Sequence, residues 1–278
     1  MPSFEFDRTT WRLLLSKPLP GAWNMAIDSA ILDAVTQGKA LPTLRLYSWK
    51  PPAISLGSAQ SAADVDLDAL RAHGWELVRR PTGGKALLNM DELTYSVIGP
   101  ENEPRLRGGV LESYRRIAAA LAAALRIVGA PVEIHTDHEK PTEPYDAAIC
   151  FEVPSSYEIV VDGRKLVGSA QARHAHGILQ HGSIPLAGDL GRITEVLRFA
   201  SPQEAAQALS RLKSRALTLQ EALGRVLDWQ ELAKAVIRGF CDQLALDLQP
   251  SFLTPWERDR ARELVEQRYA NDAWTFRL

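Results

Sequence analysis

The sequence predicts an α+β protein in which a mixed, mostly antiparallel sheet is flanked by helices and followed by a helical C-terminal part. Segments with alternating or β-branched apolar residues fill the first two thirds of the chain, and two long helical patterns interrupt them. After about residue 190 only helical patterns follow. Because strands and helices do not alternate regularly, a doubly wound parallel sheet is not expected.

The elements of the first part are expected in the following order. Apolar residues at helical spacing predict helices over 24–35 and 110–128, and the second is expected to end at Gly129. The polar, proline-bearing stretch 133–145 is typical of a surface loop. Strands are expected over 43–47, 76–80, 85–88, 93–98, 157–161, 164–172 and 178–185.

Capping residues predict where the C-terminal helices begin. A Ser or Thr precedes a Glu by three positions at Ser201–Glu204, Thr218–Glu221 and Thr254–Glu257, and Asp228–Glu231 is a close variant. The chain carries no internal repeat, low-complexity tract or linker. We therefore expect a single domain over residues 1–278, with a sheet core over about 1–190 and helices packed on it over about 190–278.

Composition excludes several classes of protein. A net charge of −2 and a pI near 6.3 argue against nucleic acid as a partner. The most apolar stretch, 117–125, is far shorter than the roughly 20 residues that span a bilayer, so no membrane role is expected. The N-terminus lacks the pattern of a secretory signal, which favours a cytoplasmic protein.

The two cysteines need separate interpretations, because two thiols in a cytoplasmic chain form no disulfide framework. Cys241 falls on the apolar face of a predicted helix, where core packing is expected. Cys150 lies between Ile149 and Phe151 and ahead of a Pro-Ser-Ser turn. Packing and nucleophilic chemistry are both compatible with that position, since free cysteine is commonly buried and its thiolate is a strong nucleophile.

A hairpin is predicted where Asp162-Gly163 separates two apolar runs. A two-residue turn pairs Val161 with Arg164 and Val160 with Lys165, which sets Lys165 on the more polar face. One interpretation is a cross-strand contact between Lys165 and Glu158. The other is an active-site ammonium that favours a nearby thiolate.

Two further motifs have a weaker meaning on their own. Residues 79–85, RRPTGGK, join two strands, and the paired glycines allow close backbone approach to a ligand or serve a plain turn. The histidines lack the spacing of a metal-binding motif, so no metal site is expected. Among them, His181 is a candidate for a hydrogen bond in a site, because it interrupts an apolar strand.

Seven segments taken together resemble the lipoate-protein ligase and octanoyltransferase superfamily, closest to its cysteine-dependent branch that takes octanoate from acyl carrier protein. The resemblance spans nearly the whole chain. The segments are residues 24–28, 44–60, RRPTGG at 79–84, ELTYSV at 92–97, ICFEVPSSYEI at 149–159, GRKLVGSAQAR at 163–173 and LQHGSI at 179–184.

The resemblance implies a fold similar to the catalytic domains of biotin protein ligases and class II aminoacyl-tRNA synthetases. It also implies that Cys150 is the nucleophile and Lys165 the active-site lysine of a single catalytic domain. Around them it implies a substrate-binding set formed by Arg80, Thr82, Gly83, Gly84, Gly168, Ser169 and His181.

The implied activity is transfer of an octanoyl group from octanoyl-acyl carrier protein to a lysine of a lipoyl-domain acceptor, such as the glycine cleavage system H protein, without ATP or another cofactor. The alternatives are an ATP-dependent lipoate-protein ligase, an octanoyl amidotransferase acting between lipoyl domains, and a non-catalytic acyl-binding relative. The sequence departs from the superfamily's usual pattern at Lys85 and Asn89, and we do not assign Asn89 a catalytic role. For docking of acidic carriers we expect a basic rim drawn from Arg79, Arg80, Lys85, Arg164 and Arg173.

Overall fold

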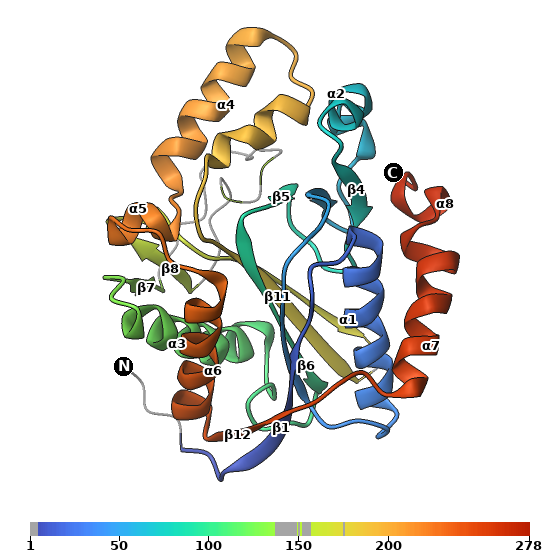
Figure 1. Cartoon of the computed structure of the whole chain (residues 1–278), viewed down its shortest axis with the longest axis vertical. Coiled ribbons are helices and arrows are strands. Elements are labelled where there is room, and N and C mark those ends of the chain that lie inside the picture. The colour runs from blue at the N-terminus through green and yellow to red at the C-terminus, as the bar shows by residue number, and fades with distance from the viewer. Residues whose placement is uncertain (1–4, 137–148, 150, 152–156, 175) are drawn as a thin grey trace.

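A six-stranded mixed sheet forms the centre of the protein (Figure 1). The computed structural model describes residues 5–136, 149, 151, 157–174 and 176–278. The pairs β10–β11, β11–β6 and β6–β2 are antiparallel, whereas β2–β1 and β1–β12 are parallel. Across the sheet the order is β10 (Gly168–His174), β11 (Gly177–Pro185), β6 (Glu92–Pro100), β2 (Thr43–Tyr47), β1 (Thr9–Leu15) and β12 (Leu246–Pro250).

Two smaller sheets lie beside the central one. The first is β4 (Glu76–Arg79), β3 (Ala53–Leu56) and β5 (Leu87–Asn89). The second is β7 (Glu133–His135), β8 (Glu158–Val161) and β9 (Arg164–Lys165). The helices are α1 (Gly21–Thr36), α2 (Leu67–Ala72), α3 (Val110–Ile127), α4 (Pro202–Arg215), α5 (Leu219–Leu223), α6 (Trp229–Leu244), α7 (Pro255–Leu264) and α8 (Asp272–Thr275), with short 3-10 turns η1 (Ala62–Asp64) and η3 (Leu190–Val196) and a π turn η4 (Val265–Tyr269).

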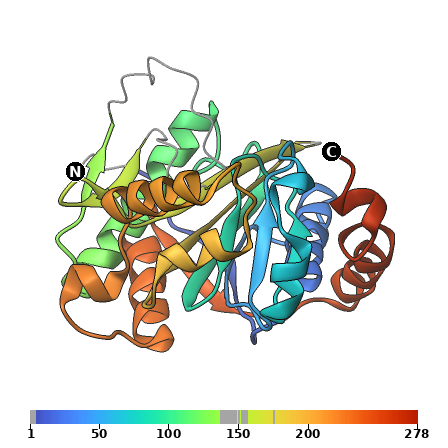
Figure 2. The same cartoon turned by 90° about the horizontal axis from the view of Figure 1, so that it is seen from above.

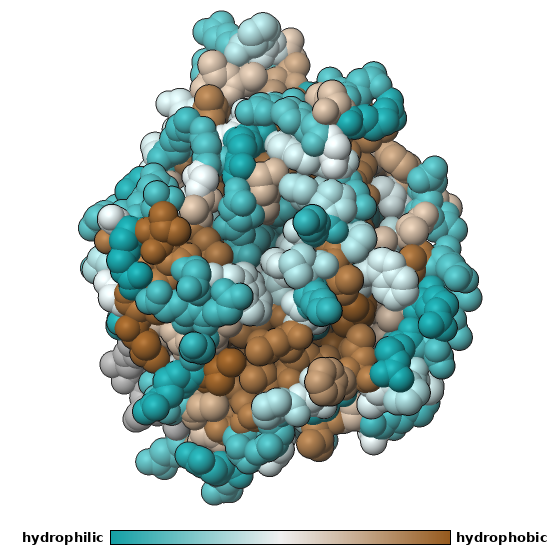
Figure 3. All heavy atoms as spheres, in the orientation of Figure 1, coloured by the Kyte–Doolittle hydropathy of each residue, from teal (hydrophilic) through white to brown (hydrophobic). Residues whose placement is uncertain are grey.

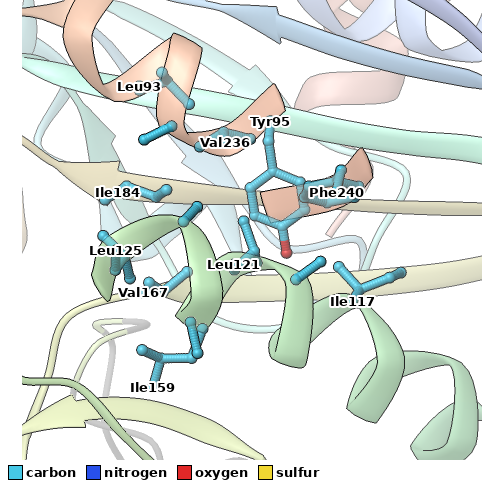
Figure 4. Packing of buried hydrophobic residues seen from close by; sticks show 14 of the residues in the cluster. Leu93, Tyr95, Ile117, Leu121, Leu125, Ile159, Val167, Ile184, Val236 and Phe240 are labelled. Carbon is cyan, nitrogen blue, oxygen red and sulfur yellow. The ribbon is translucent and has the colours of Figure 1, made fainter. Parts of the chain in front are cut away.

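Helices cover both faces of the central sheet. Seen from above, α3 and α6 lie on one side of it and α1 and α7 on the other (Figure 2). Alternation along β6 serves both sides: Leu93, Tyr95 and Val97 face the α3–α6 cluster, shown in Figure 4, and Ile98 joins the cluster around α1. A third apolar cluster forms between the β4–β3–β5 sheet, η3 and α4, and includes Ile149. The protein therefore has apolar cores on both sides of one sheet and a third beside it.

The expected α+β class is confirmed, as are the local signals. Helix α3 follows the predicted range to within one residue. Thr218 and Thr254 accept hydrogen bonds from the N–H groups of Glu221 and Glu257, so α5 and α7 begin where the capping boxes predicted. The predicted hairpin is also present: Val160 pairs with Lys165, and Asp162 and Gly163 have φ values of 49° and 72°, in the left-handed region that this turn needs.

Several predicted element bounds are wrong. The strand expected over 164–172 is two strands in different sheets, because β9 pairs with β8 and β10 pairs with β11. Part of the expected loop 133–145 is strand β7, which pairs with β8. The C-terminal part is not purely helical, since β12 returns to the central sheet and pairs with β1. The errors at β7 and β12 concern pairing between segments that are distant in the sequence. The strand expected over 164–172 is instead divided between two neighbouring hairpins.

The surface view shows apolar residues gathered between α6 and α1, where β1 crosses the molecule (Figure 3). Leu15 at the end of β1 is among the exposed apolar side chains. None of the helices in the described ranges contains an apolar stretch of the length that spans a bilayer.

Candidate active site

Two rows of polar side chains cross the central sheet on the face that carries α1. Register places Arg45, Ser96 and His181 in one row, on β2, β6 and β11. The next row holds Tyr47, Thr94 and Ser183 on the same strands. All six are buried. Since buried polar groups need partners, rows of this kind mark a site held by hydrogen bonds rather than by apolar packing alone.

Asp28 of α1 is the centre of the first row. Its carboxylate pairs with the Arg45 guanidinium at 2.7 Å and accepts hydrogen bonds from Tyr47 at 3.0 Å and Ser96 at 2.5 Å. The Nδ1 atom of His181 lies 3.6 Å from the same carboxylate. Burial acts to raise the pKa of Asp28, but Arg45 and His181 outweigh it and the net pKa is lowered. Asp28 is therefore a buried anion that orients the ring of His181.

His181 connects this network to the RRPTGG segment. Its Nε2 atom is 2.7 Å from the hydroxyl oxygen of Thr82. Gly57 holds the same segment from the other side: Ser58 N–H donates to the Thr82 carbonyl at 2.8 Å, and a Cβ on Gly57 would lie 1.8 Å from the Gly84 carbonyl oxygen. The close backbone approach in this segment is thus to Gly57, and Gly84 with φ of +94° takes a left-handed conformation.

Two arginines expected on a basic rim are structural instead. Arg79 is fully buried and donates to the carbonyls of Thr275, Gly57 and Gln60. Arg80 is 5% exposed and donates to the carbonyls of Ser55 at 2.6 Å, Gly83 at 2.9 Å and Lys85 at 2.8 Å. For these two residues the rim prediction is wrong, because their donors shape the RRPTGG turn and its neighbours.

Two other proposed rim residues, Arg164 and Arg173, make contacts within the fold. Arg164 lies 3.7 Å from Glu221 in an ion pair. Arg173 is half-buried and donates to the Gly108 and Gly109 carbonyls at the start of α3. Lys85 is half-buried.

An inner cavity with about 360 Å³ of empty space lies where the polar rows face the β4–β3–β5 sheet. Its apolar wall suits a hydrocarbon chain, and a few polar groups interrupt it. Four of the predicted substrate-binding residues line it, namely Arg80, Gly168, Ser169 and His181. Its apolar wall includes Met25, Tyr47, Trp49, Leu87 and Ala170.

A central cavity with about 430 Å³ of empty space, part of it open to solvent, adjoins the inner one, and the two share Leu87 and Ser183 as lining residues. Ile149 and Phe151 line it as well, and both are buried. Phe151 also covers Gly168, where a Cβ would lie 3.2 Å from the ring. Cys150, bonded to both of these residues in the chain, lies outside the described residues.

Lys165 is buried, and its ammonium is 2.7 Å from the Glu158 carboxylate. The cross-strand contact that the hairpin register allowed is thus present. Lys165 is not among the described residues that line the inner and central cavities. Gly168, three residues further on, lines the inner cavity. The ammonium of Lys165 therefore has a carboxylate partner on the neighbouring strand β8.

A family model of the lipoyl protein ligase A/B catalytic domain matches residues 20–241. The chain belongs to this family. Octanoyltransferase LipM of Moorella thermoacetica is 44% identical over 95% of this chain and 97% of its own length. Octanoyltransferase LipM of Symbiobacterium thermophilum is 43% identical over 97% and 99%. The expected family is confirmed, and with it the class of enzyme, an acyltransferase of protein lipoylation.

Solved structures of the family share the fold. A bi-partite lipoate protein ligase from the lipoylation system of Thermoplasma acidophilum superposes with a TM-score of 0.82 at 24% identity, and the match covers 97% of both chains. Lipoate-protein ligase A bound with ATP superposes with a TM-score of 0.78 at 25% identity, over 96% of this chain and 99% of the ligase.

Sequence reasoning missed Asp28, Thr94 and Ser183 as parts of the site. The signal was a polar residue at every second position of ELTYSV and its partner strands, which is unusual in strands buried on both faces. Asn89 also lines the inner cavity, and its amide donates to Ser55 and to the Ala53 carbonyl. Among the described residues, no group of three or more His, Cys, Asp or Glu side chains is arranged to hold a metal ion.

Proposed function

We propose that the enzyme moves an octanoyl group from acyl carrier protein to a lysine of a lipoyl domain through a thioester on Cys150. The observation that carries this proposal is the position of the central cavity. The two chain neighbours of Cys150 line it, and it adjoins an apolar inner cavity. This arrangement supports an acyl chain held in the inner cavity with its carbonyl carbon toward the central one.

In the first step, the Cys150 thiolate attacks the carbonyl carbon of the carrier thioester, and the carrier leaves as a thiolate that takes up a proton. In the second step, the neutral lysine amine attacks the enzyme thioester, the C–S bond breaks and the amine loses a proton as the amide forms. Splitting one transfer into two in this way is covalent catalysis with ping-pong kinetics. We assign the Lys165 ammonium to stabilise the thiolate and the developing oxyanion.

The inner cavity provides a reason for octanoyl rather than a larger acyl group. Arg80, His181 and Asn89 line it and are tied into hydrogen bonds with the fold. Side chains fixed in this way do not swing aside easily, so the cavity should favour one chain length. The acceptors we propose are lipoyl domains, in line with the relatives named for octanoyl transfer.

An ATP-dependent ligase is the main rival, because a solved family member binds ATP. The test is transfer of octanoate from octanoyl-carrier protein to a lipoyl domain without ATP, followed by intact mass of the acceptor. The proposal expects an octanoylated acceptor with the wild type and none with Cys150→Ser. Product that forms only from free octanoate and ATP would establish the ligase instead.

A further inference from the structure

Glu92 lies in the wall between the cavities of the proposed active site. It is 4% exposed, lines the central cavity, and accepts hydrogen bonds from the hydroxyl groups of Thr94 and Ser183. Both donors also line the inner cavity. Thr94 in turn accepts from the indole N–H of Trp49 at 2.8 Å. The carboxylate is thus held by neutral donors and has no salt bridge in the part of the chain that the structure describes.

An outer hollow, open to solvent, reaches the same carboxyl group. It has about 780 Å³ of empty space and shares Met90, Glu92 and Ala187 with the central cavity. Trp49 and Trp229 line it together with Asp91. Indole faces attract ammonium groups and cover the methylene stem of a lysine, while a carboxylate at the end of the hollow attracts its charge. This combination suits a lysine side chain that enters from solvent.

We propose that the outer hollow admits the acceptor lysine and that Glu92 removes a proton from its ammonium group. This inference rests on the proposed function, since it assigns a catalytic residue to the second step. The route runs from the outer hollow past Glu92 into the central cavity, which Ile149 and Phe151 line. An amine arriving this way meets a base before it meets the thioester on Cys150.

The acceptor lysine loses two protons in this step. The lysine ammonium gives one proton to the Glu92 carboxylate and becomes a neutral amine. The amine nitrogen attacks the thioester carbon, the C–N bond forms and the C–S bond breaks. The second proton on that nitrogen goes to the leaving Cys150 thiolate, and Glu92 returns its proton to solvent through the outer hollow.

The surroundings of Glu92 make it a suitable base near neutral pH. Burial raises the pKa of Glu92 to about 7, although Ser183 and Thr94 donate to it. Among the described residues, the charged groups that face the central cavity and the outer hollow besides Glu92 are Asp91 on the adjoining turn and Asp189 and Arg192 from the η3 side. The guanidinium of Arg192 is 2.7 Å from the Asp91 carboxylate, so it forms its ion pair with Asp91 rather than with Glu92. Ser183 on β11, Trp49 shortly after the end of β2 and Trp229 at the start of α6 are neutral.

The test separates the two halves of the reaction in Glu92→Gln. Acyl-enzyme is first formed from octanoyl-carrier protein and checked by intact mass, and then mixed with either a lipoyl domain or hydroxylamine. Hydroxylamine is already neutral near pH 7 and needs no base. We expect Glu92→Gln to form the acyl-enzyme normally, to react normally with hydroxylamine, and to transfer to the lipoyl domain about a hundredfold more slowly.

The pH profile provides a second readout. In the wild type, transfer to the lipoyl domain should fall as pH drops below about 7, where Glu92 becomes protonated. That inflection should disappear in Glu92→Gln. Glu195→Gln makes the same chemical change at an exposed carboxyl paired with His73 and should leave both reactions unchanged.

Unchanged transfer in Glu92→Gln would overturn the assignment, as would equal slowing with hydroxylamine and with the lipoyl domain, because that result indicates a structural role. Failure of the wild type to form any acyl-enzyme would instead contradict the proposed function.

Discussion

Replacing Asp28 by Asn should destabilise the protein strongly, because it leaves the Arg45 guanidinium buried without a counter-charge. Both side chains of this pair are fully buried. Removing one partner of a buried ion pair costs about 3–5 kcal/mol. Total stability of a domain is typically about 5–15 kcal/mol, so the loss is a large share of it.

Asp33→Asn is the matched control on the same helix. Asp33 pairs with Arg260 at 2.8 Å, and their side chains are 34% and 33% exposed. Pairs with that degree of solvent contact contribute about 1 kcal/mol or less. Urea unfolding followed by tryptophan fluorescence, with 7 tryptophans as probes, measures both variants.

The pH dependence of stability should also differ between the wild type and Asp28→Asn. The lowered pKa of Asp28 means that the pair contributes stability above the carboxyl's ordinary pKa of 3.8 and loses it as pH falls through the lower folded value. Asp28→Asn should lack this acid loss. Equal urea midpoints for Asp28→Asn and Asp33→Asn at neutral pH would refute the argument that the polar row depends on a buried anion.

Three further predictions concern other residues. Cys241→Ser should keep most transfer activity, measured as octanoylation of a lipoyl domain. The Cys241 thiol is half-buried at the edge of the α6 core, and burial raises its pKa, which makes it a poor nucleophile. Loss of activity in this variant would contradict the prediction. Arg79→Gln should lower the melting temperature and speed proteolysis near the C-terminus, because Arg79 donates a hydrogen bond to the Thr275 carbonyl at 2.7 Å. Unchanged stability together with an altered salt dependence of carrier binding would instead indicate that Arg79 belongs to a basic rim. Because the pKa of Glu92 is raised from 4.5 to about 7, ionisation of Glu92 should lower the free energy of unfolding of the wild type by about 3 kcal/mol as pH rises through this range. Glu92→Gln cannot ionise, so the urea midpoint of the variant minus that of the wild type should be larger at pH 8 than at pH 4. A difference in midpoint that stays constant with pH would contradict the raised pKa.

Structural features that depend on only a few neighbouring residues could be predicted from the sequence. The Asp162-Gly163 turn determines the pairing of Val160 with Lys165, because a two-residue loop has one matching register. The caps at Thr218 and Thr254 are similarly local. Turns and caps of this kind depend on residues close in the sequence, so they form in the same way whatever distant segments pack against them.

The polar rows could not be predicted in the same way. Arg45, Ser96 and His181 meet only because β2, β6 and β11 pair in one register, and a shift of one residue would turn their side chains to the other face. The rim prediction failed for Arg79 for a related reason, since its partners lie near residue 275. Resemblance to relatives identified Cys150 as a candidate, whereas Glu92 was suggested only by the arrangement of the cavities.

Trapping the acyl group on the enzyme shows directly whether Cys150 carries it. The protein is mixed with octanoyl-carrier protein without ATP or acceptor, quenched in acid, and measured by intact mass and peptide mapping. We expect one octanoyl group per chain, attached to the peptide that contains Cys150 and removed by hydroxylamine, while Cys241 stays unmodified. An octanoyl group on Cys241, or an enzyme that stays unmodified while transfer to a lipoyl domain proceeds, would contradict this expectation.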